Sequence, residues 1–249
     1  MISQADGALR EMLSRPDILE QHDQGNIFIE PFDLESVGTN SYDVRLGENF
    51  YRERFNSGLP TFHGQVEPRF LYNMYDSDHV KALYELEQAR PAKEVLHPWF
   101  QIGDLEGISP DDKVLLIRPG ESLLAHTQEF IGSNCNFITT RMAARSTIGR
   151  NALEVTRCAG VGDVGYCIRW TLEITNNLQY HMIPLVVGMR VGQVIFDGVR
   201  PLEEGDKGYT ATGKYQAAGG LKDMVENWRP ELMLPRAFLD REVLLKRNV

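Results

Sequence analysis

The sequence predicts a mainly β protein, either a barrel or a sandwich, with a few short helices. After residue 113, short strand-like stretches recur at roughly 8–12-residue spacing. Glycine and proline separate these stretches, as is typical of turns. The 249 residues are 42% hydrophobic, which is enough to bury a sizeable core. Many short strands of this kind close into a barrel or into two packed sheets.

The first elements are expected to be a helix and two strands. Residues 5–21 place apolar side chains on one helical face, and Asp6 could cap that helix. A short apolar strand is expected at residues 27–29. Residues 41–50 alternate with the period of a strand, and Gly47 indicates a turn near its end.

Residues 52–112 differ in amino-acid composition from the rest of the chain. They are rich in proline, histidine and charged residues. Apolar residues with helical spacing occur only over residues 77–90. We interpret this region as an insertion that carries one short helix.

The remaining elements are strands, followed by two helices in the tail. Short helices are expected at 222–228 and near the end of the chain. The strands are expected at 114–117, 122–127, 137–141, 153–156, 168–175 and 185–196, the last broken by Gly188 and Gly192.

Composition excludes several classes of protein. The formal net charge of -9 disfavours binding to a nucleic acid polymer, although a few local arginines suffice for a small anion. The cysteines Cys135, Cys158 and Cys167 are odd in number and form no C-x-x-C pair, which fits a reducing compartment. Neither a signal peptide nor a membrane-spanning run of about 18 apolar residues is visible. A cytoplasmic protein without a membrane partner is therefore expected.

The residues that could carry chemistry are concentrated in residues 145–176. Arg145 and Arg150 could bind phosphate through their forked donors. Ser146 and Thr147 could add hydroxyl donors. Singly, such a stretch is also typical of a surface turn with charged residues.

Three further residues in this stretch suit a sugar and a proton-transfer step. Asp163 could accept a hydrogen bond from a sugar hydroxyl, and Tyr166 could pack on a sugar face. Glu173 lies in an otherwise apolar strand, where burial raises the pKa of a carboxyl and suits it to proton transfer near neutral pH. Each also has a plainer interpretation, as a turn residue, a core residue or a solvent-facing residue.

Taken together and in order, the motifs resemble the dCTP deaminase family of the dCTP deaminase/dUTPase superfamily. The resemblance implies a dUTPase-like barrel or sandwich over residues 1–220, with an insertion at about 52–112 and a C-terminal extension at 221–249. The motifs are R-S-T-x-x-R at 145–150, D-V-G-Y at 163–166, L-E-x-x-N at 172–176, S-Y-D-V-R-L-G at 41–47, I-R-P-G-E at 117–121, G-M-R-V-G-Q at 188–193 and G-K-Y-Q at 213–216.

The resemblance implies hydrolytic deamination of dCTP to dUTP and ammonia without zinc. Glu173 would take a proton from the water that attacks C4 of cytosine, and would then protonate N3 and the leaving amino group. Ser146 and Arg150 would position the water and stabilise the developing charge. The sequence lacks the H-x-E and P-C-x-x-C signature of zinc deaminases.

The same resemblance implies a substrate-binding set, a cofactor and an assembly. Mg²⁺ would share the charge of the triphosphate, and a homotrimer would share each site between subunits. The substrate-binding residues would be Arg145, Thr147 and Lys214 at the triphosphate, Ala159 through its main-chain carbonyl, Asp163 at the 3′-hydroxyl, Tyr166 against a 2′-hydroxyl, and Tyr215 in the K-Y-Q lid.

Other activities stay open. A bifunctional enzyme would also cleave the triphosphate, releasing dUMP and pyrophosphate, and Asp163 could serve it as a base. A catalytically inactive nucleotide-sensing regulator could keep the same fold, whereas a pure dUTPase has no need of Glu173. Val161, Gly162 and Ala218 depart from the family pattern, so that a modified cytosine or another phosphorylation level is also compatible with the motifs.

Overall fold

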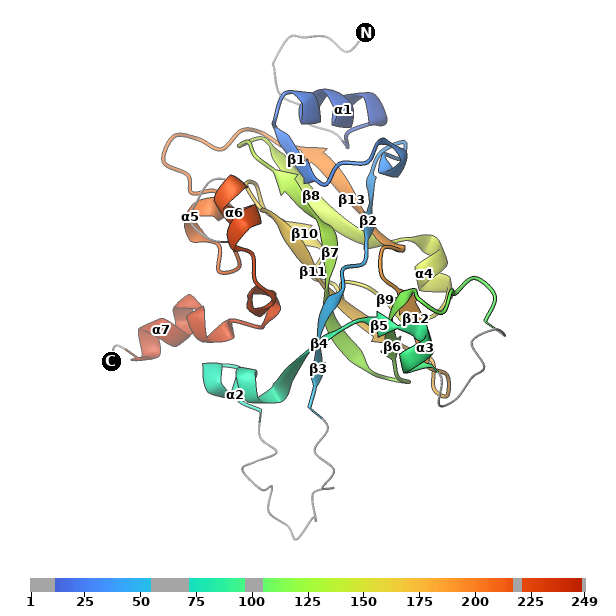
Figure 1. The fold of residues 1–249 in the computed structure, drawn as a ribbon. Coiled ribbons are helices and arrows are strands. Elements are labelled where there is room, and N and C mark those ends of the chain that lie inside the picture. The colour runs from blue at the N-terminus through green and yellow to red at the C-terminus, as the bar shows by residue number, and fades with distance from the viewer. Residues whose placement is uncertain (1–11, 55–71, 97–104, 217–220, 248–249) are drawn as a thin grey trace.

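The computed structural model describes residues 12–54, 72–96, 105–216 and 221–247, and these are built mainly from antiparallel strands (Figure 1). The predicted fold class is confirmed. The strands are β1 (Ile27–Glu30), β2 (Tyr42–Arg45), β3 (Asn49–Glu53), β4 (Tyr84–Gln88), β5 (Arg90–Pro91), β6 (Lys113–Ile117), β7 (Ser122–Ser133), β8 (Ile138–Ala144), β9 (Leu153–Glu154), β10 (Val161–Gly162), β11 (Cys167–Asn176), β12 (Ile183–Val186) and β13 (Arg190–Gly198). The helices are α1 (Arg15–Asp23), η1 (Leu34–Ser36), α2 (Ser77–Leu83), α3 (Ala92–Val95), α4 (Ser146–Arg150), α5 (Tyr209–Thr212), α6 (Leu221–Asn227), η4 (Pro230–Met233), η5 (Ala237–Leu239) and α7 (Arg241–Arg247).

The described strands form two main sheets and one small sheet. The larger sheet has the order β4-β3-β7-β11-β9, with β1 also paired to β7. The second sheet has the order β10-β8-β13-β2, and β12-β6-β5 forms the small one. Side chains from all three sheets meet in one apolar core. Fully buried members of this core are Tyr42, Leu46, Ile117, Leu123, Leu172 and Phe196.

The first helix begins later than the sequence pattern predicts. Ser14 precedes α1, and its main-chain N–H and hydroxyl both donate to the Asp17 carboxylate, at 2.9 and 2.5 Å. This capping pair fixes the start at Arg15. Met12 forms an isolated β-bridge with Asp197, so the predicted helix does not extend through it. The predicted cap at Asp6 lies outside the described residues.

The predicted helix at 77–90 is correct only in its first half. Residues 77–83 form α2, but residues 84–88 form strand β4, which pairs with β3. Tyr84 packs edge-on against Tyr51 of β3, with ring centroids 6.5 Å apart. Pairing with an existing sheet therefore overrides the helical spacing of a short segment.

The predicted strand at 41–50 is two strands in different sheets. The chain leaves β2 at Arg45, crosses at Gly47 and enters β3. A Cβ atom at Gly47 would lie 2.1 Å from the His126 ring, so that only glycine fits this crossing. Both His126 ring nitrogens already have partners, the Thr127 carbonyl and the Asn49 main-chain N–H. His126 is therefore a satisfied core residue.

The stretch predicted as one broken strand at 185–196 also divides, because the chain turns at Gly188 between β12 and β13. Gly192 does not end β13, and the pairing of β13 with β2 shifts register there. The other predicted strands and the two tail helices occur where the sequence predicts them, and their ends differ by a few residues at most. The exception is β7, which extends to Ser133 instead of ending at 127.

A buried ion pair joins the two main sheets. The Arg45 side chain in β2 donates to the Glu129 carboxylate in β7 at 2.6 Å, and the Arg45 main-chain N–H donates to the other oxygen at 2.9 Å. The Glu129 side chain is fully buried. Because the carboxylate has a partner on each oxygen, the charge is satisfied inside the core.

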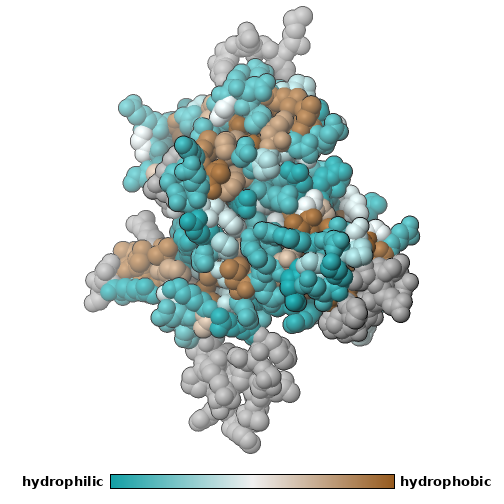
Figure 2. Space-filling model, viewed as in Figure 1, coloured by the Kyte–Doolittle hydropathy of each residue, from teal (hydrophilic) through white to brown (hydrophobic). Residues whose placement is uncertain are grey.

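The C-terminal elements pack on one side of the larger sheet. Met224 of α6 is buried against Phe130, Cys167 and Ile168. Helix α4 lies on the opposite side of the molecule from α5 and α6 (Figure 1). Figure 2 shows an apolar group over η5 and α7, where Leu239, Leu244 and Leu245 are exposed.

Within the described ranges, no helix has the length and apolar character that crossing a membrane requires.

Candidate active site

A cavity of about 480 Å³ lies between β11 and the C-terminal segment. Its floor comes from β11 and the start of β7, and Tyr84 of β4 adds a wall. Four of the predicted site residues line it: Ala159, Tyr166, Glu173 and Tyr215. The volume falls within the usual range for small-molecule sites.

Glu173 is the acidic residue of this cavity. It stands on β11 opposite Leu124 of β7, and its neighbours Leu172 and Ile174 are buried on the other face. One carboxylate oxygen is buried without a hydrogen-bond partner in the described structure. Burial raises the pKa of Glu173 to about 7, against weaker lowering effects of its own main-chain N–H and the Arg157 cation. A carboxyl with this pKa can both take and give a proton near neutral pH.

The raised pKa of Glu173 predicts a pH-dependent gain in stability for Glu173→Gln. The carboxyl is neutral in both states below its ordinary value of 4.5, so it then has no effect on stability. As pH rises towards 7, the unfolded chain loses the proton while the folded chain keeps it, and stability falls. At pH 8 the variant should therefore have a higher free energy of unfolding than the wild type, by at most about 3 kcal/mol. At pH 4 the two proteins should be equally stable, and thermal unfolding at both pH values checks this. A constant difference across this range would contradict the raised pKa.

Arg157 is a cavity residue that the motifs do not identify. It and Cys158 adopt left-handed backbone conformations, with φ of 38° and 71°. Non-glycine residues adopt this region at a cost of about 1 kcal/mol or more each. The Ala159 main-chain N–H donates to the Thr156 carbonyl at 2.7 Å, which closes the turn. The turn holds an arginine at the cavity next to Glu173.

Removing the Arg157 cation should shift the acid limb of the activity profile. Because the cation favours the ionised carboxylate, Arg157→Met raises the pKa of Glu173 further. The half-activity point of kcat/KM should then move to higher pH, while Arg157→Lys keeps the wild-type profile. Arg157 is exposed, so high salt should move the wild-type profile towards that of the methionine variant. A methionine variant with an unchanged profile would show that Arg157 does not act on Glu173.

Tyr166 and Asp163 lie on one turn but in different surroundings. Tyr166 packs edge-on against Trp170 and Tyr209, with ring centroids 4.8 and 4.9 Å away, and burial raises its pKa. Asp163 is exposed, and its main-chain carbonyl accepts the Tyr166 N–H at 2.8 Å. Asp163 is not among the described residues that line the cavity. Tyr166 thus belongs both to the core and to the cavity wall.

Residues 213–216, which the resemblance predicts as a lid segment, are fixed beside this turn. The Gln216 side chain accepts the Cys167 main-chain N–H at 2.9 Å and donates to the Gly165 carbonyl at 3.3 Å. Tyr215 lines the cavity, and the Lys214 ammonium is paired with the Asp240 carboxylate. Lys214 therefore lies at the edge of the site, with a carboxylate from the tail already bound.

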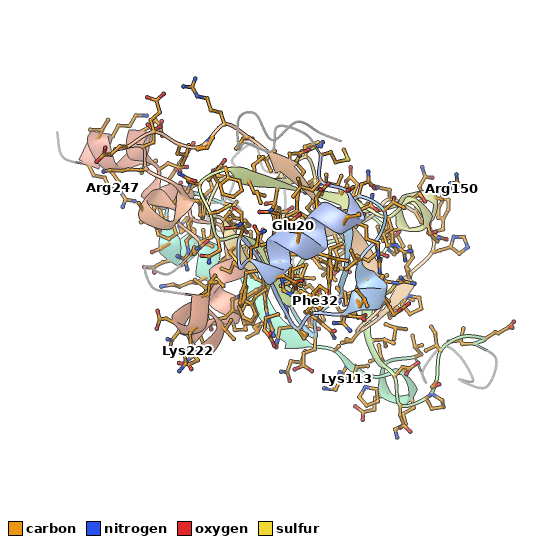
Figure 3. All side chains as sticks on the ribbon, turned by 90° about the horizontal axis from the view of Figure 1, so that it is seen from above. Glu20, Phe32, Lys113, Arg150, Lys222 and Arg247 are labelled. Atoms are coloured by element: carbon orange, nitrogen blue, oxygen red, sulfur yellow. The ribbon has the colours of Figure 1, made fainter. Side chains whose placement is uncertain are left out.

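The structure does not bring the α4 residues to Glu173. Ser146, Thr147 and Arg150 are exposed, and Arg145 pairs with Asp43 at 3.3 Å. None of the four lines the cavity. Figure 3 shows Arg150 on the side of the molecule opposite to Lys222 of α6. The residues that follow α6, from Trp228 to Pro235, include several that line the cavity. Within one chain, the predicted phosphate and water-positioning residues are therefore separated from the predicted base.

Gly162 has a structural reason to differ from the family pattern. A Cβ atom at this position would lie 2.3 Å from the Thr140 hydroxyl and 2.7 Å from the Trp170 ring. Trp170 fills the space that a side chain at 162 would need. Its indole N–H donates to the Ile131 carbonyl at 3.0 Å, which fixes the ring.

Comparison with known proteins identifies the family. A profile of the dCTP deaminase-like family matches residues 12–199. The chain belongs to this family. A dCTP deaminase of Halorubrum lacusprofundi is 28% identical over 213 residues, which cover 84% of this chain and 88% of the relative. A dUMP-forming dCTP deaminase of Corynebacterium glutamicum is 29% identical over 212 residues, which cover 84% of this chain and 93% of the relative.

A solved structure of 2′-deoxycytidine 5′-triphosphate deaminase from Agrobacterium tumefaciens aligns with 77% of this chain and 49% of its own length, at 14% identity and a TM-score of 0.47. The dCTP deaminase resemblance read from the motifs is confirmed by the family match. That match ends at residue 199, so that the lid segment and the whole tail lie beyond it.

In this dCTP deaminase-like protein, the tail closes the cavity. Trp228, Leu232, Met233 and Pro235 line the side opposite β11. Trp228 stacks on the guanidinium of Arg169, which also stacks on Phe130; the guanidinium carbon is 4.8 Å from each ring centroid. Sequence analysis identified none of these residues as part of the site, because apolar tail residues carry no motif.

No cluster of three or more metal-binding side chains occurs in the described ranges.

Proposed function

We propose that this enzyme deaminates dCTP to dUTP and ammonia, with Glu173 as general base and general acid. The observation that carries the proposal is the unpartnered, buried carboxylate oxygen in the wall of a nucleotide-sized cavity. A buried acceptor without a partner is costly in a folded protein unless a ligand satisfies it. An attacking water, held against the cytosine ring, would supply that partner.

The proposed reaction uses the two protonation states of Glu173. The ionised carboxylate takes a proton from water as the water oxygen bonds to C4, and the proton passes to ring N3. Glu173 then takes the proton of the new C4 hydroxyl and passes it to the amino group. The C4–N bond breaks, ammonia leaves, and the C4 oxygen becomes the carbonyl of uracil. Ala159 would accept a hydrogen bond from the amino group through its main-chain carbonyl, and Tyr166 would pack on the deoxyribose.

We propose that a second copy of the chain supplies the α4 residues, in a homotrimer with shared sites. The exposure of Ser146, Thr147 and Arg150 away from the cavity supports this arrangement. In the assembled site, Ser146 and Arg150 would position the water and stabilise charge at the ring. Arg145, Thr147 and Lys214 would bind the triphosphate with Mg²⁺, and Asp163 would bind the 3′-hydroxyl.

Mixing two inactive variants tests whether the site is shared. Glu173→Gln and Arg150→Ala each damage one half of the proposed site. If the halves come from different subunits, a co-refolded equal mixture should regain about a quarter of wild-type activity, because symmetric rings then contain some intact sites. If one chain holds the whole site, the mixture stays inactive and the proposal of shared sites fails.

Product analysis decides between the activities. Purified protein is incubated with dCTP and Mg²⁺, with a chelator as control, and the nucleotides are separated by ion exchange. Release of dUTP supports the proposal. Release of dUMP with pyrophosphate indicates the bifunctional enzyme, and relatives bear both kinds of name. If dCTP, dUTP and modified dCTPs all stay intact, a nucleotide-sensing regulator replaces the enzyme.

A further inference from the structure

Two cations lie beside Tyr215 at the edge of the Glu173 cavity. The Lys214 ammonium is 5.9 Å and the Arg236 guanidinium carbon is 5.8 Å from the centroid of the Tyr215 ring. Arg236 comes from the tail, between η4 and η5. Its side chain donates to the Lys214 carbonyl at 2.6 Å, and its main-chain N–H donates to the Tyr215 hydroxyl at 3.2 Å. These bonds hold Arg236 against the lid segment.

The cluster contains two cations but one carboxylate. Asp240 pairs with Lys214, whereas Arg236 has no ion pair in the described part of the chain. The cluster of Lys214, Arg236 and Asp240 thus carries a net positive charge within a protein of net charge -9. The Arg236 guanidinium uses one donor on the Lys214 carbonyl, which leaves further donors of the fork for a ligand. Phosphate is the ligand that such a fork binds best.

The segment that carries Arg236 is anchored on both sides. Before it, Met233 and Leu234 are buried against Tyr51 and Val80. Pro235, which precedes Arg236 directly, lines the cavity. After it, Asp240 is bonded to the lid through Lys214. Packed residues before Arg236 and the Asp240–Lys214 pair after it therefore fix the position of its main chain beside the cavity.

We propose that Arg236 is a further substrate-binding residue that contacts the phosphates of the nucleotide, and that Asp240 is the counterion that these phosphates displace from Lys214. The inference rests on the proposed function, which places the base at Glu173 and the triphosphate at Lys214. The Lys214 and Asp240 side chains are 33% and 38% exposed, so the Asp240 carboxylate can move into water when phosphate arrives.

Two neutralising variants have opposite expected effects. Arg236→Gln removes a phosphate ligand and should weaken binding of Mg–dCTP about tenfold or more. Asp240→Asn removes the competing carboxylate and should strengthen binding about threefold. Dissociation constants are measured by calorimetry in the Glu173→Gln background, which prevents turnover. Deoxycytidine, which lacks phosphate, should bind equally to all variants.

Arg229→Gln is the matched control. Arg229 is an exposed arginine of the same segment, and its side chain donates only to the Trp228 carbonyl in the described structure. The same change of charge there should leave the affinity for Mg–dCTP unaltered. Arg236→Lys keeps the charge without the planar fork and should bind with intermediate affinity. Thermal unfolding shows first that each variant is folded.

If the tail contacts serve only to hold the tail, both variants loosen it and both weaken binding. That result would overturn the inference. So would an equal loss of affinity for deoxycytidine, or a failure of the protein to bind any nucleoside triphosphate. A wild type that converts dCTP while both variants weaken binding keeps the proposed function and loses the inference. If the wild type converts no dCTP, but Arg236→Gln still weakens and Asp240→Asn still strengthens binding of the triphosphate, the inference stands and the proposed function fails.

Discussion

Replacing Glu173 with glutamine is expected to lower kcat for dCTP deamination by about 10³-fold and to leave the affinity for Mg–dCTP nearly unchanged. Glutamine has the shape of the protonated acid but cannot accept the proton of the attacking water. The phosphate and sugar contacts proposed for the substrate do not involve this side chain. Single-turnover release of ammonia measures the chemical step, and calorimetry measures the binding.

Glu154→Gln is a suitable control for this substitution. Glu154 is exposed on β9, next to β11, where it pairs across the ladder with Thr175. It should keep wild-type turnover. Given dUTP instead of dCTP, the Glu173 variant should retain any diphosphatase activity of a bifunctional enzyme, because that cleavage does not use the base at cytosine. Near-wild-type deamination by the Glu173 variant would rule out the proposed mechanism.

The second large effect is expected on stability, at the ion pair between the two main sheets. Arg45→Met leaves the buried Glu129 carboxylate without its charged partner, and should lower the free energy of unfolding by about 3–5 kcal/mol. Urea unfolding measures this loss. Combining it with Glu129→Leu removes the orphaned charge and should recover a large part of the stability.

Arg141 provides a matched comparison. It pairs with Asp197 at the same 2.6 Å nitrogen–oxygen distance, but its side chain is 48% exposed. Arg141→Met should therefore cost about 1 kcal/mol or less, because water screens the charge that remains. Equal losses for the two arginines would mean that burial does not govern the strength of the Arg45 pair.

The sequence was most informative where one local pattern decides the outcome. The position of Glu173 between Leu172 and Ile174 left two interpretations open, a carboxyl in apolar surroundings and a solvent-facing residue, and the structure shows one carboxylate oxygen buried and the pKa raised. Short strand-like stretches bounded by turn residues likewise located β6, β7, β8 and β11. In these cases the residues themselves set the period of the strand and the polarity of the surroundings.

Sequence spacing was less informative about distance in space. Ser146 and Glu173 belong to the same stretch of sequence, with the rest of α4, β9 and β10 between them, yet only Glu173 lines the cavity. The helical pattern at 77–90 did not show that pairing with β3 turns its second half into a strand. The left-handed conformation of Arg157 was also invisible, because no glycine signals it. Each of these outcomes depends on contacts between distant segments.

The stacking of Trp228 on Arg169 gives the protein a built-in optical reporter. The chain has three tryptophans, and Trp170 is buried in the core with its N–H bonded. Both Trp170 and Trp228 line the cavity, but Trp228 lies in the tail, in contact with a guanidinium. Its fluorescence depends on whether the tail stays docked, so that an unlabelled sample can report opening of the cavity during a nucleotide titration.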